Sequence, residues 1–216
     1  MLKLRGVVPA LTTPFKEDRS LDLASLRRLV DILIDEGVHG LVAGGCTGES
    51  WALEDDEPHS LFKAAVEQAK GRVPIVAGCS GIAPKHVIKK ARMAEAAGCD
   101  ALMIQPPYYA LPGEDEVFDF YKEILAATKL PVMIYNIPRR NGINMSVDLV
   151  GRLAEQPGVF AIKESSKGHC HVVERRTQKT SVPLNFKRPR PPCAMCSSSM
   201  HGRLGASMQK SDNVER

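Results

Sequence analysis

The feature that most restricts the fold of this chain is a repeated pair of segments, a short apolar run followed by an amphipathic helix. The pair occurs five times along the sequence, at intervals of about 30 residues, and a sixth apolar run follows. Short apolar runs are typical of strands buried on both faces, which require helical crossovers and a parallel sheet. The expected strands cover residues 6–11, 40–43, 73–78, 101–105, 131–136 and 158–163.

Helices are expected after these strands, from apolar side chains at helical spacing and from signals at the helix ends. The first helix stops at Gly37, and Pro84 suits the first turn of the third. Ser146 suits an N-cap, and residues 137–142 are expected to form a loop. The expected helices cover residues 23–34, 58–70, 84–97, 113–128 and 146–153.

Regular alternation without a glycine-rich dinucleotide fingerprint favours a (β/α)-barrel over a doubly wound sheet. A complete (β/α)8 TIM barrel has eight such units in about 250 residues. This chain has 216 residues, and its pattern ends after the sixth strand. We therefore expect an α/β protein of the TIM-barrel family, with a partial barrel domain at residues 1–166.

The remaining residues, 167–216, differ from the barrel domain in charge and pattern. They hold 10 lysines and arginines against 3 carboxylates, whereas residues 1–166 hold 19 against 22. No apolar period continues, and several prolines interrupt any helix. We expect a disordered or irregular tail, explained by a shifted reading frame or by fusion to unrelated sequence.

Two functions for the tail stay open as alternatives. Cys193 and Cys196, with histidines nearby, suggest zinc, but the spacing fits no paired zinc knuckle. The basic residues suggest nucleic acid, but aromatic residues are scarce there. We expect neither a metal site nor specific nucleic-acid binding.

Composition points to an ordinary cytoplasmic protein. Hydrophobic residues make up 44% of the chain and charged residues 25%, and no apolar run reaches the length of a membrane span. The six cysteines are scattered rather than spaced as a disulfide framework, which indicates a reducing compartment.

Lys163 is the first candidate for chemistry, because it ends an expected strand in which four of the five preceding residues are apolar. Loss of hydration at such a position lowers the pKa of the amine and exposes its neutral form. A neutral amine is what attack on a ketone carbonyl needs, so Lys163 is a candidate Schiff-base former. The alternative is a lysine that caps the strand and points into solvent.

Further candidates follow the other strands, whose carboxyl ends all open on one face of a barrel. The loop with Cys46, Thr47 and Gly48 offers main-chain N–H groups for a carboxylate. Tyr135, one strand before Lys163, can shuttle protons, and Arg140 can pair with a substrate carboxylate. A plain turn for the loop and a solvated arginine remain the structural alternatives.

At these residues the sequence resembles the dihydrodipicolinate synthase / N-acetylneuraminate lyase superfamily of class I aldolases and lyases. The resemblance covers residues 4–166 and includes the order and intervals of the motifs. The matching segments are residues 44–49 (GGCTGE), 108–109 (YY), 135–142 (YNIPRRNG) and 162–164 (IKE).

The resemblance implies an enzyme that forms a Schiff base between Lys163 and pyruvate or another 2-oxo acid, without metal or organic cofactor. Tyr135 would be the neighbouring acid and base, and Cys46, Thr47 and Gly48 would hold the carboxylate. Tyr109 matches a tyrosine that family members lend across a dimer interface, so a homo-dimer or tetramer is implied. Arg140 matches an arginine that favours an acidic second substrate.

Two departures from the family pattern matter. Cys46 stands where the usual motif has a threonine, and a thiol is a poorer hydrogen-bonding group than a hydroxyl. A member that dehydrates or deaminates a 2-oxo acid, or an aldolase, therefore fits as well as a synthase. The second departure is the missing continuation after Ser166, which leaves a non-functional relic of such an enzyme as the alternative reading.

Overall fold

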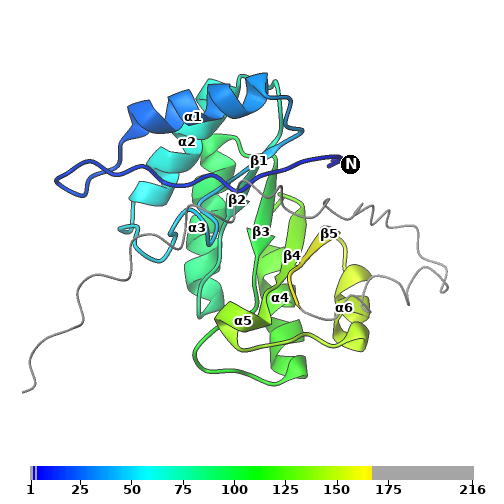
Figure 1. Cartoon of the computed structure of the whole chain (residues 1–216). Helices are drawn as coiled ribbons and strands as arrows, with labels where there is room; N and C mark the ends of the chain where they lie inside the picture. Colours follow the sequence, from blue (N-terminus) through cyan, green and yellow to red (C-terminus); the bar gives the residue numbers. More distant parts are fainter. Residues whose placement is uncertain (1, 3, 167–216) are drawn as a thin grey trace, which may run out of the picture. The chain divides into compact units, whose positions relative to one another are not determined.

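A parallel sheet of five strands forms the centre of the computed structural model, which describes residues 2 and 4–166 (Figure 1). The strands lie in sequence order, each hydrogen-bonded to the next. They are β1 (Leu41–Ala43), β2 (Ile75–Gly78), β3 (Ala101–Ile104), β4 (Val132–Asn136) and β5 (Val159–Glu164). This consecutive parallel order with a helix in each main crossover is the arrangement of a barrel wall.

The helices agree with the expected ranges to within two residues, apart from one that was not expected. Asp22 Oδ1 accepts the Ser25 N–H at 2.9 Å and starts the first helix, and Ser146 Oγ accepts the Leu149 N–H at 3.1 Å and starts the last. The helices are α1 (Leu23–Asp35), α2 (Glu57–Ala69), α3 (Pro84–Ala97), α4 (Glu114–Ala127), α5 (Pro138–Asn141) and α6 (Val147–Ala154).

The prediction of a loop at residues 137–142 was wrong, because these residues contain the single turn of α5. Pro138 takes the first helical position, where its missing N–H has no intrahelical partner to lose. Gly142 ends the turn at φ +81°, a conformation that glycine adopts without strain. The sequence therefore held both end signals of a short helix.

The prediction of a full strand at residues 6–11 was also wrong. The segment runs beside β1, with hydrogen bonds from Leu11 N to Val42 O at 2.8 Å and from Val42 N to Pro9 O at 2.9 Å. It forms only an isolated bridge between Ala10 and Val42. Pro9 has no N–H to donate, so the ladder cannot continue through it.

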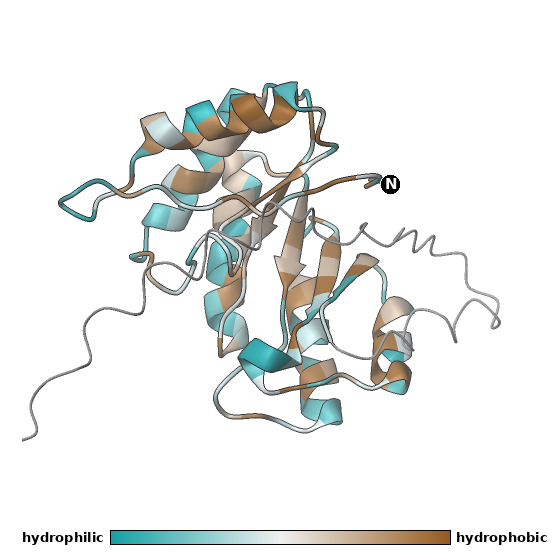
Figure 2. Ribbon diagram, viewed as in Figure 1, coloured by the Kyte–Doolittle hydropathy of each residue, from teal (hydrophilic) through white to brown (hydrophobic). Residues whose placement is uncertain are grey.

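The sheet separates two apolar layers. The helix-facing layer is the larger and includes Leu102, Ile104 and the wholly buried Tyr121. The opposite layer holds Val76, Met103, Met133 and Tyr135 from the strands, which corresponds to the inside of a barrel. Figure 2 shows apolar residues along the strands and polar residues on the outer helix surfaces.

An irregularity in β5 decides which of its side chains face inward. Val132 pairs with Val159 but the next residue, Met133, pairs with Ala161, so Phe160 is an extra residue on β5. Such a bulge reverses the alternation of side chains beyond it. Ile162 consequently packs in the helix-facing layer, and Lys163 lies beside Tyr135.

None of the helices in the described part of the chain is long and apolar enough to cross a membrane. The expectations of an irregular tail, of zinc at Cys193 and Cys196 and of nucleic-acid binding concern residues 167–216, which lie outside the described residues.

Candidate active site

Lys163 and Tyr135 lie side by side at the carboxyl ends of β5 and β4. The two residues are register partners across the strand pair. Lys163 Nζ lies over the Tyr135 ring, 4.4 Å from its centroid. Tyr135 is almost completely buried, and Lys163 is partly buried. The predicted neighbours therefore do meet, and the amine has an aromatic face instead of bulk water on one side.

Burial shifts both pKa values away from their ordinary range. Loss of hydration lowers the pKa of the Lys163 amine, an effect that the Cys46 thiol opposes. Loss of hydration also raises the pKa of the Tyr135 phenol, with Ser165 and Arg140 acting in the opposite direction. The pair is thus shifted toward a neutral amine beside a protonated phenol, the forms that addition to a carbonyl requires.

Cys46 follows β1 and comes close enough to act electrostatically on both Lys163 and Tyr135. Its Sγ contacts Gln105 Oε1 at 3.7 Å, and Gln105 is itself 91% buried behind β3. The thiol is therefore near the Lys163 amine and in contact with a buried amide oxygen. The prediction that the loop after β1 meets Lys163 agrees with this geometry.

The loop that contains Cys46 is held in place by a hydrogen bond from Thr13 in the N-terminal segment. Thr13 Oγ1 donates a hydrogen bond to Gly48 O at 2.5 Å, and the Gly48 N–H donates to Gly45 O at 3.0 Å. Within residues 4–166, the N–H groups of Cys46 and Thr47 have no hydrogen-bond partner. Two successive free N–H groups form a concave site suited to an anion.

Gly78→Ala is expected to destabilise the fold, because a Cβ at this position would lie 2.3 Å from Gly44 O and 2.6 Å from Gly44 C. The obstructing atoms are backbone, so the start of the Cys46 loop must move. Overpacking of this kind costs about 1–3 kcal/mol. Urea unfolding measures the loss, and Gly113→Ala is the matched control, since its nearest neighbour would be 3.8 Å away. Equal stabilities for the two variants would contradict this account.

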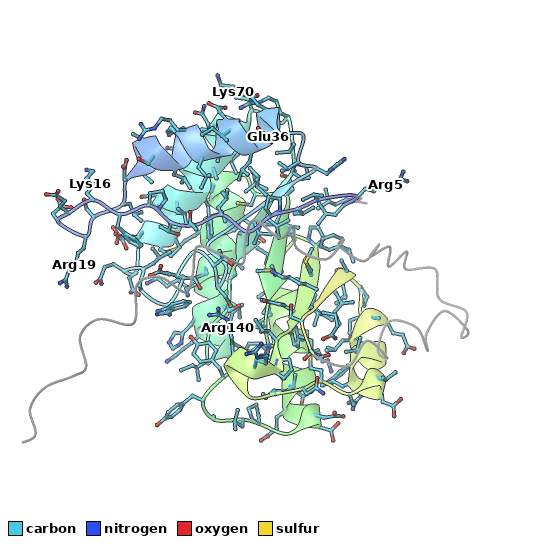
Figure 3. All side chains as sticks on the ribbon, viewed as in Figure 1. Arg5, Lys16, Arg19, Glu36, Lys70 and Arg140 are labelled. Carbon is cyan, nitrogen blue, oxygen red and sulfur yellow. The ribbon has the colours of Figure 1, made fainter. Side chains whose placement is uncertain are left out.

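Arg140 lies on α5, beyond the carboxyl end of β4 (Figure 3). Its side chain is exposed, and its charge partly opposes the rise in the pKa of Tyr135 that burial causes. Within the described part of the chain it has no ion-pair partner. The arginine is thus available to an anion that approaches the strand ends, as the sequence suggested.

Two further predicted site residues, Thr47 and Tyr109, are exposed and do not contact Lys163 within the described chain. Thr47 is exposed, and only its backbone fits the proposed role. Tyr109 is 90% exposed at φ +75°, a strained conformation for a tyrosine. Nearby on the chain, Leu111 is also exposed, at 55%. Tyr109 therefore cannot serve the site of its own chain in this conformation.

The sequence motifs include Asn136 and Glu164 but assign neither a role of its own, and Gln105 was not singled out. Asn136 Nδ2 donates to Glu164 Oε2 at 3.0 Å, directly behind the Tyr135–Lys163 pair. Gln105 faces the Cys46 thiol. All three are polar residues at the end of a buried strand, and that signal was available in the sequence. Within the described residues, no group of three or more His, Cys, Asp or Glu side chains is placed to hold a metal.

Comparison with known proteins supports the resemblance. The sequence model of the dihydrodipicolinate synthetase family matches residues 3–185. A 4-hydroxy-tetrahydrodipicolinate synthase of Bradyrhizobium diazoefficiens is 42% identical over 174 residues, which are 81% of this chain and 58% of that protein. The synthase of Methylococcus capsulatus is 39% identical over 163 residues, 76% of this chain and 56% of that protein.

Solved structures agree with the fold. Dihydrodipicolinate synthase DapA-2 from Bacillus anthracis superposes with a TM-score of 0.81 at 34% identity, covering 84% of this chain and 62% of that chain. The Acinetobacter baumannii dihydrodipicolinate synthase, solved with pyruvate, gives 0.74 at 34% identity, covering 76% and 56%. These neighbours are TIM barrels, so the predicted fold class is confirmed.

The chain spans just under three fifths of the length of the two curated relatives, at 58% and 56%. The family match extends past residue 166, where the sequence pattern placed the domain boundary. The position of that boundary stays a prediction.

Proposed function

Because the chain belongs to the dihydrodipicolinate synthetase family, we propose that it activates pyruvate or a similar 2-oxo acid as a Schiff base on Lys163. The observation that carries the proposal is the placement of Lys163 Nζ over the buried Tyr135 ring, 4.4 Å from the centroid. Burial favours the neutral amine, which is the nucleophile. A structural relative has been solved with pyruvate bound, which supports the choice of 2-oxo acid.

The proposed reaction begins when the Lys163 amine attacks the C2 carbonyl and forms a carbinolamine. The Tyr135 phenol donates a proton to the departing hydroxyl, water leaves, and an iminium forms. The Tyr135 phenolate left by this transfer takes a proton from C3 and gives an enamine, which is the carbon nucleophile for an aldol-type addition. All groups used are side chains of this chain, and the activated carbon is held covalently, so no separate cofactor is invoked.

The carboxylate of the 2-oxo acid would bind the free N–H groups of Cys46 and Thr47, with Gly48 fixing the turn. Arg140 would meet an acidic group on a second substrate, because its guanidinium is exposed beyond β4. Dehydration or deamination of a 2-oxo acid uses the same enamine, so these reactions belong to the same proposal.

Tyr109 would serve a second copy of the chain. Its 90% exposure and strained backbone suit a side chain that is buried only when another copy covers it. A homo-dimer or tetramer in the cytoplasm is therefore part of the proposal. The alternative is a family member that no longer catalyses, and its motivation is the departure from the family pattern at Cys46 and after Ser166.

Exchange of the pyruvate methyl protons tests the proposal. An enamine forms only through the Schiff base, so the folded protein should accelerate deuterium incorporation at C3 in D₂O, as followed by proton NMR. The rate should rise with pH through the lowered pKa of Lys163, since the neutral amine reacts. Buffer-level exchange by a sample shown to be folded by circular dichroism would favour the inactive alternative.

Cys46→Thr is expected to accelerate this exchange. A hydroxyl next to Lys163 and Tyr135 donates and accepts hydrogen bonds better than the thiol, so it can pass a proton along a hydrogen-bonded chain. The gain should approach the roughly 100-fold contribution of a positioned proton-transfer group. Cys46→Ser tests the same hydroxyl without the methyl group, and Cys79→Ser alters a buried thiol elsewhere. An unchanged or lower rate in both Cys46 variants would mean that the thiol suits a different reaction.

A further inference from the structure

Asn136 and Glu164 are the next register pair after Tyr135 and Lys163, at the ends of the same two strands. Because side chains alternate along a strand, they lie on the opposite face of the sheet from the candidate site. Asn136 is completely buried. Its Nδ2 donates to both carboxylate oxygens of Glu164, at 3.1 Å and 3.0 Å.

The remaining hydrogen bonds of this pair tie three segments together. Asn136 Nδ2 also donates to Asn144 Oδ1 at 3.0 Å, and Asn136 Oδ1 accepts the Met145 N–H at 3.2 Å. Glu164 Oε1 accepts the Ser166 N–H at 2.7 Å. The ends of β4 and β5 are thereby connected to the segment that leads into α6.

Among the described strands, β5 pairs only with β4, so β4 must fix the orientation of its last residues. The bulge at Phe160 makes this requirement stronger, because a slip of one residue would turn Lys163 to the helix-facing layer. Glu164 has no lysine or arginine partner within the described residues, so its carboxylate is used by the amide and not by an ion pair.

We propose that Asn136 and Glu164 are positioning residues, whose amide–carboxylate contact holds the ends of β4 and β5 in register and keeps the Lys163 amine over Tyr135. The effect of these two residues on catalysis rests on the proposed function. Their effect on the position of the Lys163 amine can be tested without it.

Among residues 4–166, the titratable groups that face Lys163 are Tyr135 from β4 and Cys46 from the loop after β1. Glu164 faces away from it. Removing the Glu164 charge would, by electrostatics alone, lower the pKa of Lys163. Losing the clamp would let the amine reach water and raise that pKa toward its ordinary value. Glu164→Ala therefore separates a positioning role from a purely electrostatic one by the sign of the shift.

Competitive acetylation measures the placement of the amine. The full chain is treated with acetic anhydride over a pH series, and labelling of the Lys163 and Lys129 peptides is quantified by mass spectrometry. The pH at which labelling of Lys163 is half-maximal is its midpoint. We expect Asn136→Ala and Glu164→Ala each to move this midpoint to higher pH. They should also slow trapping of the pyruvate adduct by borohydride at pH 7 roughly 10- to 100-fold, since small misplacements have effects of this size.

A swapped pair and a matched control sharpen the result. Asn136→Asp alone places two carboxylates opposite each other and should break the contact. Asn136→Asp combined with Glu164→Gln again places one amide opposite one carboxylate. The double variant should therefore recover the labelling midpoint of Lys163 and the rate of adduct trapping. Asn144→Ala removes a different partner of Asn136 and should leave both values unchanged. Circular dichroism establishes that each variant is folded, and Glu164→Ala decides the matter if Asn136→Ala does not fold.

An unchanged or lower Lys163 midpoint in folded Glu164→Ala would overturn the positioning role, even if pyruvate adducts form normally. Absence of any pyruvate adduct in the unmodified protein, together with the expected acetylation shifts, would instead overturn the proposed function and leave the positioning role in place.

Discussion

Lys163→Arg is expected to abolish both the pyruvate adduct and the protein-catalysed exchange of the pyruvate methyl protons. A guanidinium remains protonated at every accessible pH and cannot attack a carbonyl, although it preserves the positive charge. The amine at this position is the side chain that attacks the carbonyl in the proposed reaction. Intact-mass measurement after borohydride reduction checks the adduct, and proton NMR in D₂O checks the exchange.

Lys129→Arg is the matched control for this loss. Lys129 is exposed and precedes β4, so it lies at the opposite end of the strands from Lys163. The control variant should form the adduct at the rate of the unmodified protein. A Lys163→Arg variant that still gains the mass of one reduced pyruvate would contradict the assignment.

Tyr135→Phe is expected to slow the exchange by at least about 100-fold without unfolding the protein. The change keeps the aromatic ring over which Lys163 lies. It removes only the hydroxyl that passes protons to the carbinolamine. Adduct formation should slow in parallel, because dehydration of the carbinolamine needs the same proton. The initial rate of deuterium incorporation at C3 is the quantity to compare.

Tyr121→Phe removes a hydroxyl of the same kind on the opposite face of the sheet, where it meets the backbone of Tyr135 and not its phenol. The Tyr121 hydroxyl donates to Ile104 O at 2.8 Å in the helix-facing layer. Its loss should cost about 1 kcal/mol of stability and leave the exchange rate unchanged. Equal slowing in both tyrosine variants would indicate a general loss of structure and count against a proton-transfer role for Tyr135.

The barrel pattern could be predicted from the sequence because buried parallel strands are continuous apolar runs, whereas amphipathic helices have apolar residues at helical spacing. Ser146 at its N-cap position and Pro84 in the first turn of α3 occur where end signals predicted them. The first strand was misjudged because Pro9 lies within an otherwise strand-like run. The turn of α5 was missed because four residues are too few to show a helical repeat of apolar side chains.

The site was predictable where chemistry and strand ends coincide, as at Lys163, Tyr135 and Cys46. The bulge at Phe160 was not, because an extra residue is visible only when a partner strand gives the register. The Asn136–Glu164 contact was missed for the same reason, since its residues are far apart in the sequence and meet only through that register. The role proposed for Tyr109 requires a second copy of the chain, so it could come only from the family resemblance and not from the residues of one chain.

The most direct test of the account is to locate the covalent adduct. The full chain is incubated with pyruvate, reduced with borohydride and digested, and the modified peptides are sequenced by mass spectrometry. The account predicts one reduced pyruvate on Lys163 in a sample shown to be folded. An adduct on a different lysine, or none in such a sample, would contradict it.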